Sequence, residues 1–372
     1  MKRQNGFIIP LVLMLISVII VLATSIYQKG SLFVPFMQVV KEREHAKMLA
    51  LSGVQVAMSQ LASPKQFATE KEQPTETPSS EKKDESETKQ DPAKKKAESA
   101  EQQAQNLLSQ LLPTINQWQE YPLKKDIDGI EGIIKISLSC EEGKIDLNRI
   151  YDFAQKKFVG EGQPRGDWKK TLEFVCQRIQ KQMKISDNLF ESFEKFFKQR
   201  HSKINDATEL LPLNGFKSFA RSLFYDPSSQ KSKEQQLYLL DIFTTYGSAK
   251  LQPWLISPSL QDIFEFKGGN QSEKQKKQEM MQSLVKKLKP VINVSQEWNT
   301  IFQPLYGIEF KRVHKGLEAF FDGSFDPKIF SVVSYGVVGQ VTQRIYAILE
   351  RVRHVTKDKT WYDVKVRKFY WI

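Results

Sequence analysis

Residue types that catalyse reactions or bind metals are present in this chain but are not grouped. The sequence has no Gly-rich phosphate loop, nucleophile elbow or paired metal-ligand spacing. Histidine, the usual acid or base near neutral pH, occurs at four dispersed positions: His45, His201, His314 and His354. We therefore expect no enzyme activity, no catalytic residue, no cofactor and no metal site.

Two acidic turns, at residues 126–129 and 322–326, come nearest to a cation site. Their carboxylates could hold Ca²⁺, but the first turn lacks the distant Glu of an EF-hand loop. Ordinary surface turns are the favoured interpretation.

The only two cysteines, Cys140 and Cys176, leave two alternatives open. They could form a disulfide in an oxidising compartment. Each also stands where the pattern predicts burial, one on a strand and one on a helix.

The N-terminal segment is the strongest signal in the chain. Residues 7–26 carry no charge, and twenty helical residues at about 1.5 Å each span about 30 Å, the hydrocarbon thickness of a bilayer. Lys2 and Arg3 precede this run, which favours a cytoplasmic N-terminus. We expect a single-pass membrane helix, with the bulk of the chain on the far side of the membrane.

The junction between Gly6 and Phe7 resembles the processing site of the type IV pilin family, in which a short basic leader ending in Gly is followed by Phe and an apolar helix. The resemblance implies cleavage after Gly6 by a prepilin peptidase and methylation of the new N-terminus. An ordinary signal peptide cleaved near Ala23, or an unprocessed signal anchor, are the alternatives.

Pro10 supports processing on separate grounds. In a helix continuing from Arg3, this proline would remove a backbone hydrogen bond and clash with the preceding turn, at a cost of about 3 kcal/mol. After cleavage at Gly6 it would be the fourth residue, where a helix leaves its N–H groups unpaired.

Beyond the membrane run, small and apolar residues recur at spacings of three and four and predict that the helix continues to residue 62. They are Ala46, Leu49, Ala50, Gly53, Val56, Ala57 and Leu61. Residues 63–103 contain 8 Lys and 10 acidic residues with almost no apolar side chain, so a disordered charged linker is predicted there.

The remaining segments predict a sheet interrupted by helices. An amphipathic helix is expected at 102–118, and a hairpin at 133–147 with Lys135, Ser137 and Ser139 on its polar face. Helices follow from 167 to 321, including a capping box of Asp206 and Glu209 before a helix at 210–224. Strands are expected at 330–338, 341–352 and 361–371.

The fold class is therefore α+β, with a long N-terminal membrane helix, a small antiparallel sheet and a large inserted, mostly helical domain. The expected segments are a leader at 1–6, a membrane-spanning and stalk helix at 7–62, the linker at 63–103, a helix and first strands at 104–150, the inserted domain at 151–325 and C-terminal strands at 326–372.

This arrangement resembles the general secretion pathway protein K family, the large minor pseudopilins of type II secretion. Residues 143–148 (Gly-Lys-Ile-Asp-Leu-Asn) resemble the family's Gly-Lys-Ile-Asn-Leu-Asn run, with Asp146 in place of Asn. Residues 207–216 and 330–351 resemble its helix–turn segment and its final strand pair. Leu11 stands where most pilins carry a Glu, and lacking that Glu is typical of this family.

The resemblance implies a pilin-like sheet, a place at the tip of a pseudopilus and a bacterial inner-membrane location. Expected partners are other minor pseudopilins, the major pseudopilin, the prepilin peptidase and the inner membrane. Assembly would use the N-terminal helix through Phe7, Ile8, Leu11 and Leu15.

Alternatives are a minor pilin of a type IV pilus, a competence pseudopilus subunit or a membrane-anchored DNA-binding protein. The net charge of +12 and the turn at residues 210–216 favour the last of these. That turn lacks the second Gly of a phosphate-binding hairpin, and the basic residues are spread, so no nucleic-acid partner is expected.

Overall fold

The computed structural model describes residues 8–62, 111–112, 114–225, 236–266, 302, 305–306, 308–310, 317–322, 327–355 and 360–372. The predicted leader with Gly6, the residue Phe7 after the predicted cleavage site and the predicted charged linker lie outside these residues.

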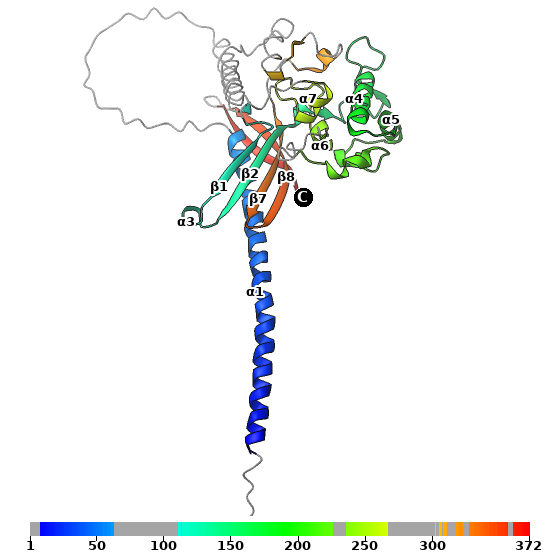
Figure 1. The fold of residues 1–372 in the computed structure, drawn as a ribbon. Helices are drawn as coiled ribbons and strands as arrows, with labels where there is room; N and C mark the ends of the chain where they lie inside the picture. The colour runs from blue at the N-terminus through cyan, green and yellow to red at the C-terminus, as the bar shows by residue number, and fades with distance from the viewer. Residues whose placement is uncertain are drawn as a thin grey trace, which may run out of the picture.

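One continuous helix, α1 (Ile8–Leu61), forms the stem of the molecule. Its first part projects away from the globular region and its last part lies on a sheet (Figure 1). Within the described residues, Pro10–Tyr27 is the one segment whose length and apolar composition would let it cross a membrane, and none of it is buried inside the protein. The predicted continuation of the apolar N-terminal helix to residue 61 is confirmed.

A five-stranded antiparallel sheet, in the order β1-β2-β7-β8-β9, receives the end of α1. Alternation of apolar residues on β2, and β-branched and aromatic residues on the last three strands, account for these strands. Their bounds are β1 (Trp118–Leu123), β2 (Gly132–Cys140), β7 (Ile329–Val338), β8 (Val341–Val355) and β9 (Thr360–Trp371). The four strands predicted at 133–140 and in the C-terminal segment are confirmed.

Small residues allow α1 to lie close to the sheet. The buried side chains of the helix are Ala46, Leu49, Ala50, Val54, Ala57 and Leu61. A Cβ on Gly336 of β7 would meet the backbone of Ala46 and Ala50, and a Cβ on Gly53 would meet Ser334 and two isoleucines of β2. The Ser334 hydroxyl donates to the carbonyl of Ala50 at 2.7 Å. The predicted stripe is therefore the packing face, with Val54 added and Val56 only partly buried.

The inserted region leaves the sheet after β2 and returns to it at β7, so strands distant in sequence pair directly. Asp167 and Asn188 cap its two main helices through their side chains. Its helical elements are η1 (Glu141–Gly143), α4 (Trp168–Met183), α5 (Leu189–Gln199), η2 (Ala207–Leu210), η3 (Phe216–Arg221), α6 (Leu239–Ile242), α7 (Pro258–Ile263) and η7 (Leu317–Phe320). Short strands are β3 (Ile145–Asp146), β4 (Tyr151–Asp152), β5 (Lys157–Phe158) and β6 (Phe243–Thr244), and a helical turn, α3 (Lys125–Asp128), joins β1 to β2. The α+β class with an additional helical region is confirmed.

Two local predictions were wrong, and a third lies mostly outside the described residues. The hairpin at 133–147 does not form, because β2 pairs with β1 and β7, while β3 pairs in parallel with β6 of the inserted region. Most of the helix predicted at 102–118 lies outside the described residues, and its end is instead the start of β1 at Trp118. The capping box of Asp206 and Glu209 is present, but it opens the four-residue η2 instead of a long helix at 210–224.

We predict that Gly336→Ala lowers the free energy of unfolding by about 1–3 kcal/mol. The added methyl group would collide with the backbone of α1, which cannot move without repacking. Thermal unfolding of the full chain in detergent would measure the effect. Gly30→Ala is the control: a Cβ there meets nothing within 4 Å, so Ala should leave the melting temperature unchanged or raise it slightly. Equal melting temperatures for Gly336→Ala and the unmodified chain would contradict the close packing of α1 on β7.

Candidate assembly surface and its attachment to the head

The first part of α1 presents an apolar surface that nothing in the described chain covers. Leu11 is 54% exposed and Leu15 is 56% exposed, and the other large apolar side chains described between residues 12 and 27 are also exposed. A helix that is apolar on all sides is stable when lipid or other helices surround it. This surface is therefore the candidate functional site.

Polar side chains within this segment are hydrogen-bonded inside the helix. Ser17 donates to the carbonyl of Met14 at 2.8 Å, and Thr24 donates to the carbonyl of Ile20 at 2.7 Å. A hydroxyl that bonds its own helix needs no water, which suits a helix in hydrocarbon. Both features are consistent with a signal or membrane anchor.

The structure places only part of the predicted site. Gly6 and Phe7 lie outside the described residues. Ile8 begins α1, although its side chain is not described. Leu11 and Leu15 follow it at spacings of three and four, so the three positions share one helix face. Their role in assembly stays a prediction.

A buried arginine joins the end of α1 to the sheet. Arg351 of β8 donates from Nε to the carbonyl of Leu61 at 3.0 Å, and its guanidinium carbon lies 3.3 Å from the centre of the Tyr362 ring. A cation at a helix C-terminus pairs with unsatisfied carbonyls and with the negative end of the helix dipole. No local sequence pattern predicts this contact, because its partners are far apart along the chain.

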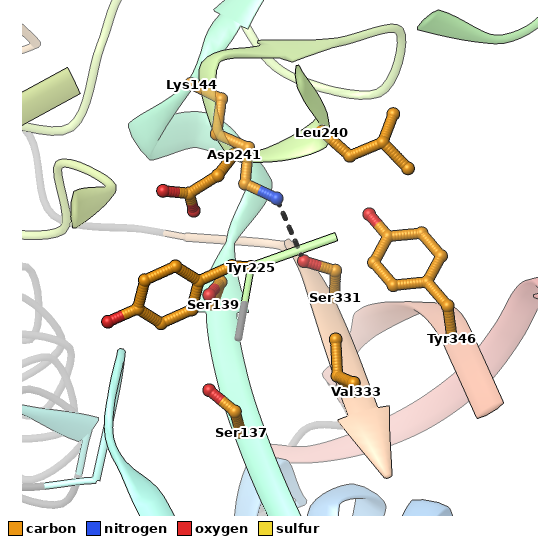
Figure 2. Close-up of a pocket in the computed structure, with 9 residues that line it drawn as sticks. All are labelled: Ser137, Ser139, Lys144, Tyr225, Leu240, Asp241, Ser331, Val333 and Tyr346. Atoms are coloured by element: carbon orange, nitrogen blue, oxygen red, sulfur yellow. Dashed lines mark hydrogen bonds between the residues drawn. The ribbon is translucent and has the colours of Figure 1, made fainter. Parts of the chain in front are cut away.

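The inserted region covers the sheet face opposite α1. Figure 2 shows a cavity between them, lined by Ser137 and Ser139 of β2, Ser331 and Val333 of β7 and Tyr346 of β8 on one side, and by Lys144, Tyr225, Leu240 and Asp241 on the other. Its volume is about 10 Å³, room for about one water molecule. The strand face predicted to be polar is thus buried, with Ser137 and Ser139 almost inaccessible.

A buried ion pair holds this junction together. The ammonium of Lys144 bonds Glu141 and also donates to the Ser331 hydroxyl at 3.0 Å (Figure 2). Glu141 in turn accepts from the hydroxyl of Thr244 in β6. Both charged side chains are 2% exposed, so each depends on the other to offset its loss of hydration.

Two further buried carboxylates lie around this pair. Burial raises the pKa of Asp146 to about 6, although the backbone N–H of Asn148 donates to it and opposes the shift. Burial also raises the pKa of Asp241, which accepts from the backbone N–H of Ser259 at 2.7 Å. Arg149 and Lys203 oppose the shift at Asp146, and Lys144 opposes it at Asp241, but burial outweighs these charges.

A second contact ties the inserted region to the edge strand. Asp206 accepts from Lys368 at 2.8 Å and from the Tyr370 hydroxyl, both on β9. Burial works against ionisation of Asp206, but these bonds outweigh it and hold the pKa of the carboxyl below its usual value. The residue thus serves both as helix cap and as bridge.

Cys140 and Cys176 are buried free thiols in the structure, on β2 and α4 as predicted. Burial raises the pKa of both thiols, so neither is a thiolate near neutral pH. The disulfide alternative is not realised.

The turn considered for DNA phosphate is packed inside the protein. Gly215 has a positive φ of 79°, and a Cβ there would meet Ile185, Asp187 and Leu189. Leu210 and Phe216 on either side are fully buried. Among the residues that the structure describes, no group of three His, Cys, Asp or Glu side chains could hold a metal ion.

No protein-family model matches the chain, and no curated protein matches it. Among solved structures, a similar chain belongs to the crystal structure of the GspK-GspI-GspJ complex from the type 2 secretion system of enterotoxigenic Escherichia coli. The alignment covers 75% of this chain and 95% of that chain, with 15% sequence identity and a TM-score of 0.36. A TM-score of this size establishes neither a fold nor a family for this chain.

We predict that Lys144→Met destabilises the protein by about 3–5 kcal/mol, because it leaves Glu141 buried without its counter-charge. The double variant Lys144→Met with Glu141→Gln should recover much of that loss, since Gln can still accept from Thr244. Chemical denaturation in detergent would compare them, and a double variant no more stable than the single one would contradict the ion-pair account.

The pKa of Asp146 predicts a pH dependence. Its folded pKa of about 6 lies above the ordinary value of 3.8, so the native state binds the proton more tightly and stability falls as pH rises from about 4 through 6. Asp146→Asn should remove this slope and raise stability at pH 7.5 by at most about 3 kcal/mol. Melting temperatures of both proteins at pH 4.5 and 7.5 would measure it, and parallel pH profiles would contradict the assignment.

Proposed function

We propose that this protein is a minor pseudopilin of a type II secretion system, anchored in a bacterial inner membrane with its N-terminus in the cytoplasm. It acts in assembly and has no catalytic role. The observation that carries the proposal is α1 itself, a single helix that is exposed and apolar over the length of a bilayer and then packs through small residues on an antiparallel sheet.

Processing would prepare this helix for assembly. Cleavage after Gly6 by a prepilin peptidase removes Lys2 and Arg3, so that the mature chain begins at Phe7 and has no charged side chain before the end of its apolar run. Phe7, Ile8, Leu11 and Leu15 then meet the helices of other minor pseudopilins and of the major pseudopilin. Burial of an apolar helix surface against similar helices needs no directional contacts, which suits repeated addition and removal of subunits.

The inserted region supports a place at the tip. In Figure 1 the inserted region lies to one side of the sheet. The sheet and the inserted region together form the head, which is much wider than the single helix α1 that projects from it. Its attachment through the Lys144 to Glu141 pair and through Asp206 holds it against the sheet. A head of this width would obstruct a further subunit above it, and this favours a capping role.

The test is the N-terminal peptide of the mature protein, measured by mass spectrometry from membranes with and without an active prepilin peptidase. We predict a peptidase-dependent start at Phe7, heavier by one methyl group. Gly6→Leu should retain Met1, because the larger side chain blocks the cut, whereas the control Gln4→Ala should be processed normally. A start at Met1 or near Ile26 in the unmodified protein, or normal cleavage of Gly6→Leu, would count against this function.

A further inference from the structure

The junction between the sheet and the inserted region leaves two buried polar atoms without a partner. In the part of the chain that the structure describes, Asp241 Oδ1 and the Ser137 hydroxyl make no hydrogen bond. Asp241 is 1% exposed and Ser137 is 2% exposed. Native proteins pair nearly all such atoms, with protein groups or with ordered water, because an unpaired one loses its bonds to solvent and gains none.

Both atoms belong to residues that line the same small cavity. Its volume of about 10 Å³ matches the room that one water molecule needs. The apolar and aromatic residues around it are themselves buried, with Leu240 9% exposed and Tyr346 6% exposed. A molecule in this cavity would therefore be held inside the protein, among polar groups that need partners.

Lys144 has one more donor than its partners use. A lysine ammonium carries three N–H donors and no acceptor. Glu141 accepts from one of them, and the Ser331 hydroxyl accepts from a second at 3.0 Å. The Lys144 side chain is 2% exposed, so bulk solvent does not reach the third. Within the described residues, this donor is left for another acceptor.

The Lys144 ammonium lies near Asp241 but does not bond its free oxygen. Burial raises the pKa of Asp241, and the charge of Lys144 opposes that shift, so the two groups are neighbours. Asp241 Oδ1 nevertheless has no hydrogen-bond partner, so a gap separates it from the ammonium. Figure 2 shows the two side chains next to each other, on the side of the cavity away from Ser137. A short gap between a donor and an acceptor is where a bridging water binds.

We infer that this cavity binds one water molecule, which accepts from the Lys144 ammonium and donates to Asp241 Oδ1. Asp241 lies on α6 and Ser331 on β7, so the water links the inserted region to the sheet through Lys144. The inference goes beyond the proposed function and does not depend on it.

The charges around the site favour water over an ion. A cation in the cavity would lie against the Lys144 ammonium, and an anion would lie against the carboxylates of Asp241 and Glu141. Water is neutral and fits the volume. It both accepts and donates, which matches one free donor and one free acceptor.

A crystal structure of the full chain, at a resolution that shows ordered water, tests the inference. We expect one solvent peak at about 2.7–3.2 Å from both Lys144 Nζ and Asp241 Oδ1. An empty cavity, a direct bond between Lys144 and Asp241, or a peak with the close shell of oxygen ligands that a metal ion requires would each overturn the inference.

Two substitutions of Asp241 test its part in the bridge by the same method. Asp241→Asn should keep the water, because the amide can accept from the backbone N–H of Ser259, as the carboxylate does, and donate to the water. Asp241→Leu should lose the water, because leucine has no polar side-chain atom. A peak that persists at the same place in Asp241→Leu, or that is absent from Asp241→Asn, would overturn the assignment.

Val333→Ile gives a readout in solution. Val333 lines the cavity, so the added methyl group would occupy the space that we assign to the water. Filling an empty cavity stabilises a protein, whereas displacing a bridging water leaves Lys144 and Asp241 without their shared partner.

We therefore expect Val333→Ile to lower the melting temperature of the full chain in detergent by about 2–4 °C. The matched control Val341→Ile, which is only partly buried and lies outside the cavity, should change it little. A melting temperature of Val333→Ile that is unchanged or raised would overturn the bound water.

Discussion

The close approach of α1 to the sheet is the constraint on which the rest of the structure depends. One helix must be apolar on every side where lipid surrounds it, and must then present Ala46, Ala50 and Gly53 to a sheet whose Gly336 lacks a side chain. Small residues on both surfaces bring the backbones together, so that Ser334 can bond a helix carbonyl. The sheet that packs on α1 in turn supports the inserted region, which leaves it after β2 and returns to it at β7.

The far face of the sheet shows how a large insertion is accommodated. Serines that would suit a solvated strand face instead line a small cavity beneath the inserted region, beside the buried Lys144 and Glu141. A buried ion pair is a weak source of net stability, but it tolerates few alternative arrangements because each charge needs its partner. It thus fixes how the insertion lies, while Asp206 holds the edge strand from the same side.

Exposed large apolar side chains gather in two places in the described part of the chain. One is the first part of α1, and the other is the end of β9, with Val366, Phe369, Trp371 and Ile372. An apolar helix surface of this kind is weakly selective among other apolar helices, because its contacts are not directional.

Much of the fold was predictable, because local pattern fixes elements whose faces differ in environment. Composition determined the long apolar N-terminal helix, spacing determined the stripe from Ala46 to Leu61, and alternation determined β2 and the C-terminal strands. The hairpin at 133–147 failed because strand pairing is chosen by long-range packing, and the helix at 210–224 failed because a capping box marks a helix start but not its length. The sequence by itself thus determined the apolar N-terminal helix and the strands on which its end packs. Only the tertiary structure decided the burial of Ser137 and of the pair of Lys144 with Glu141, because both are buried where the inserted region, with Thr244 and Leu240, meets strands β2 and β7.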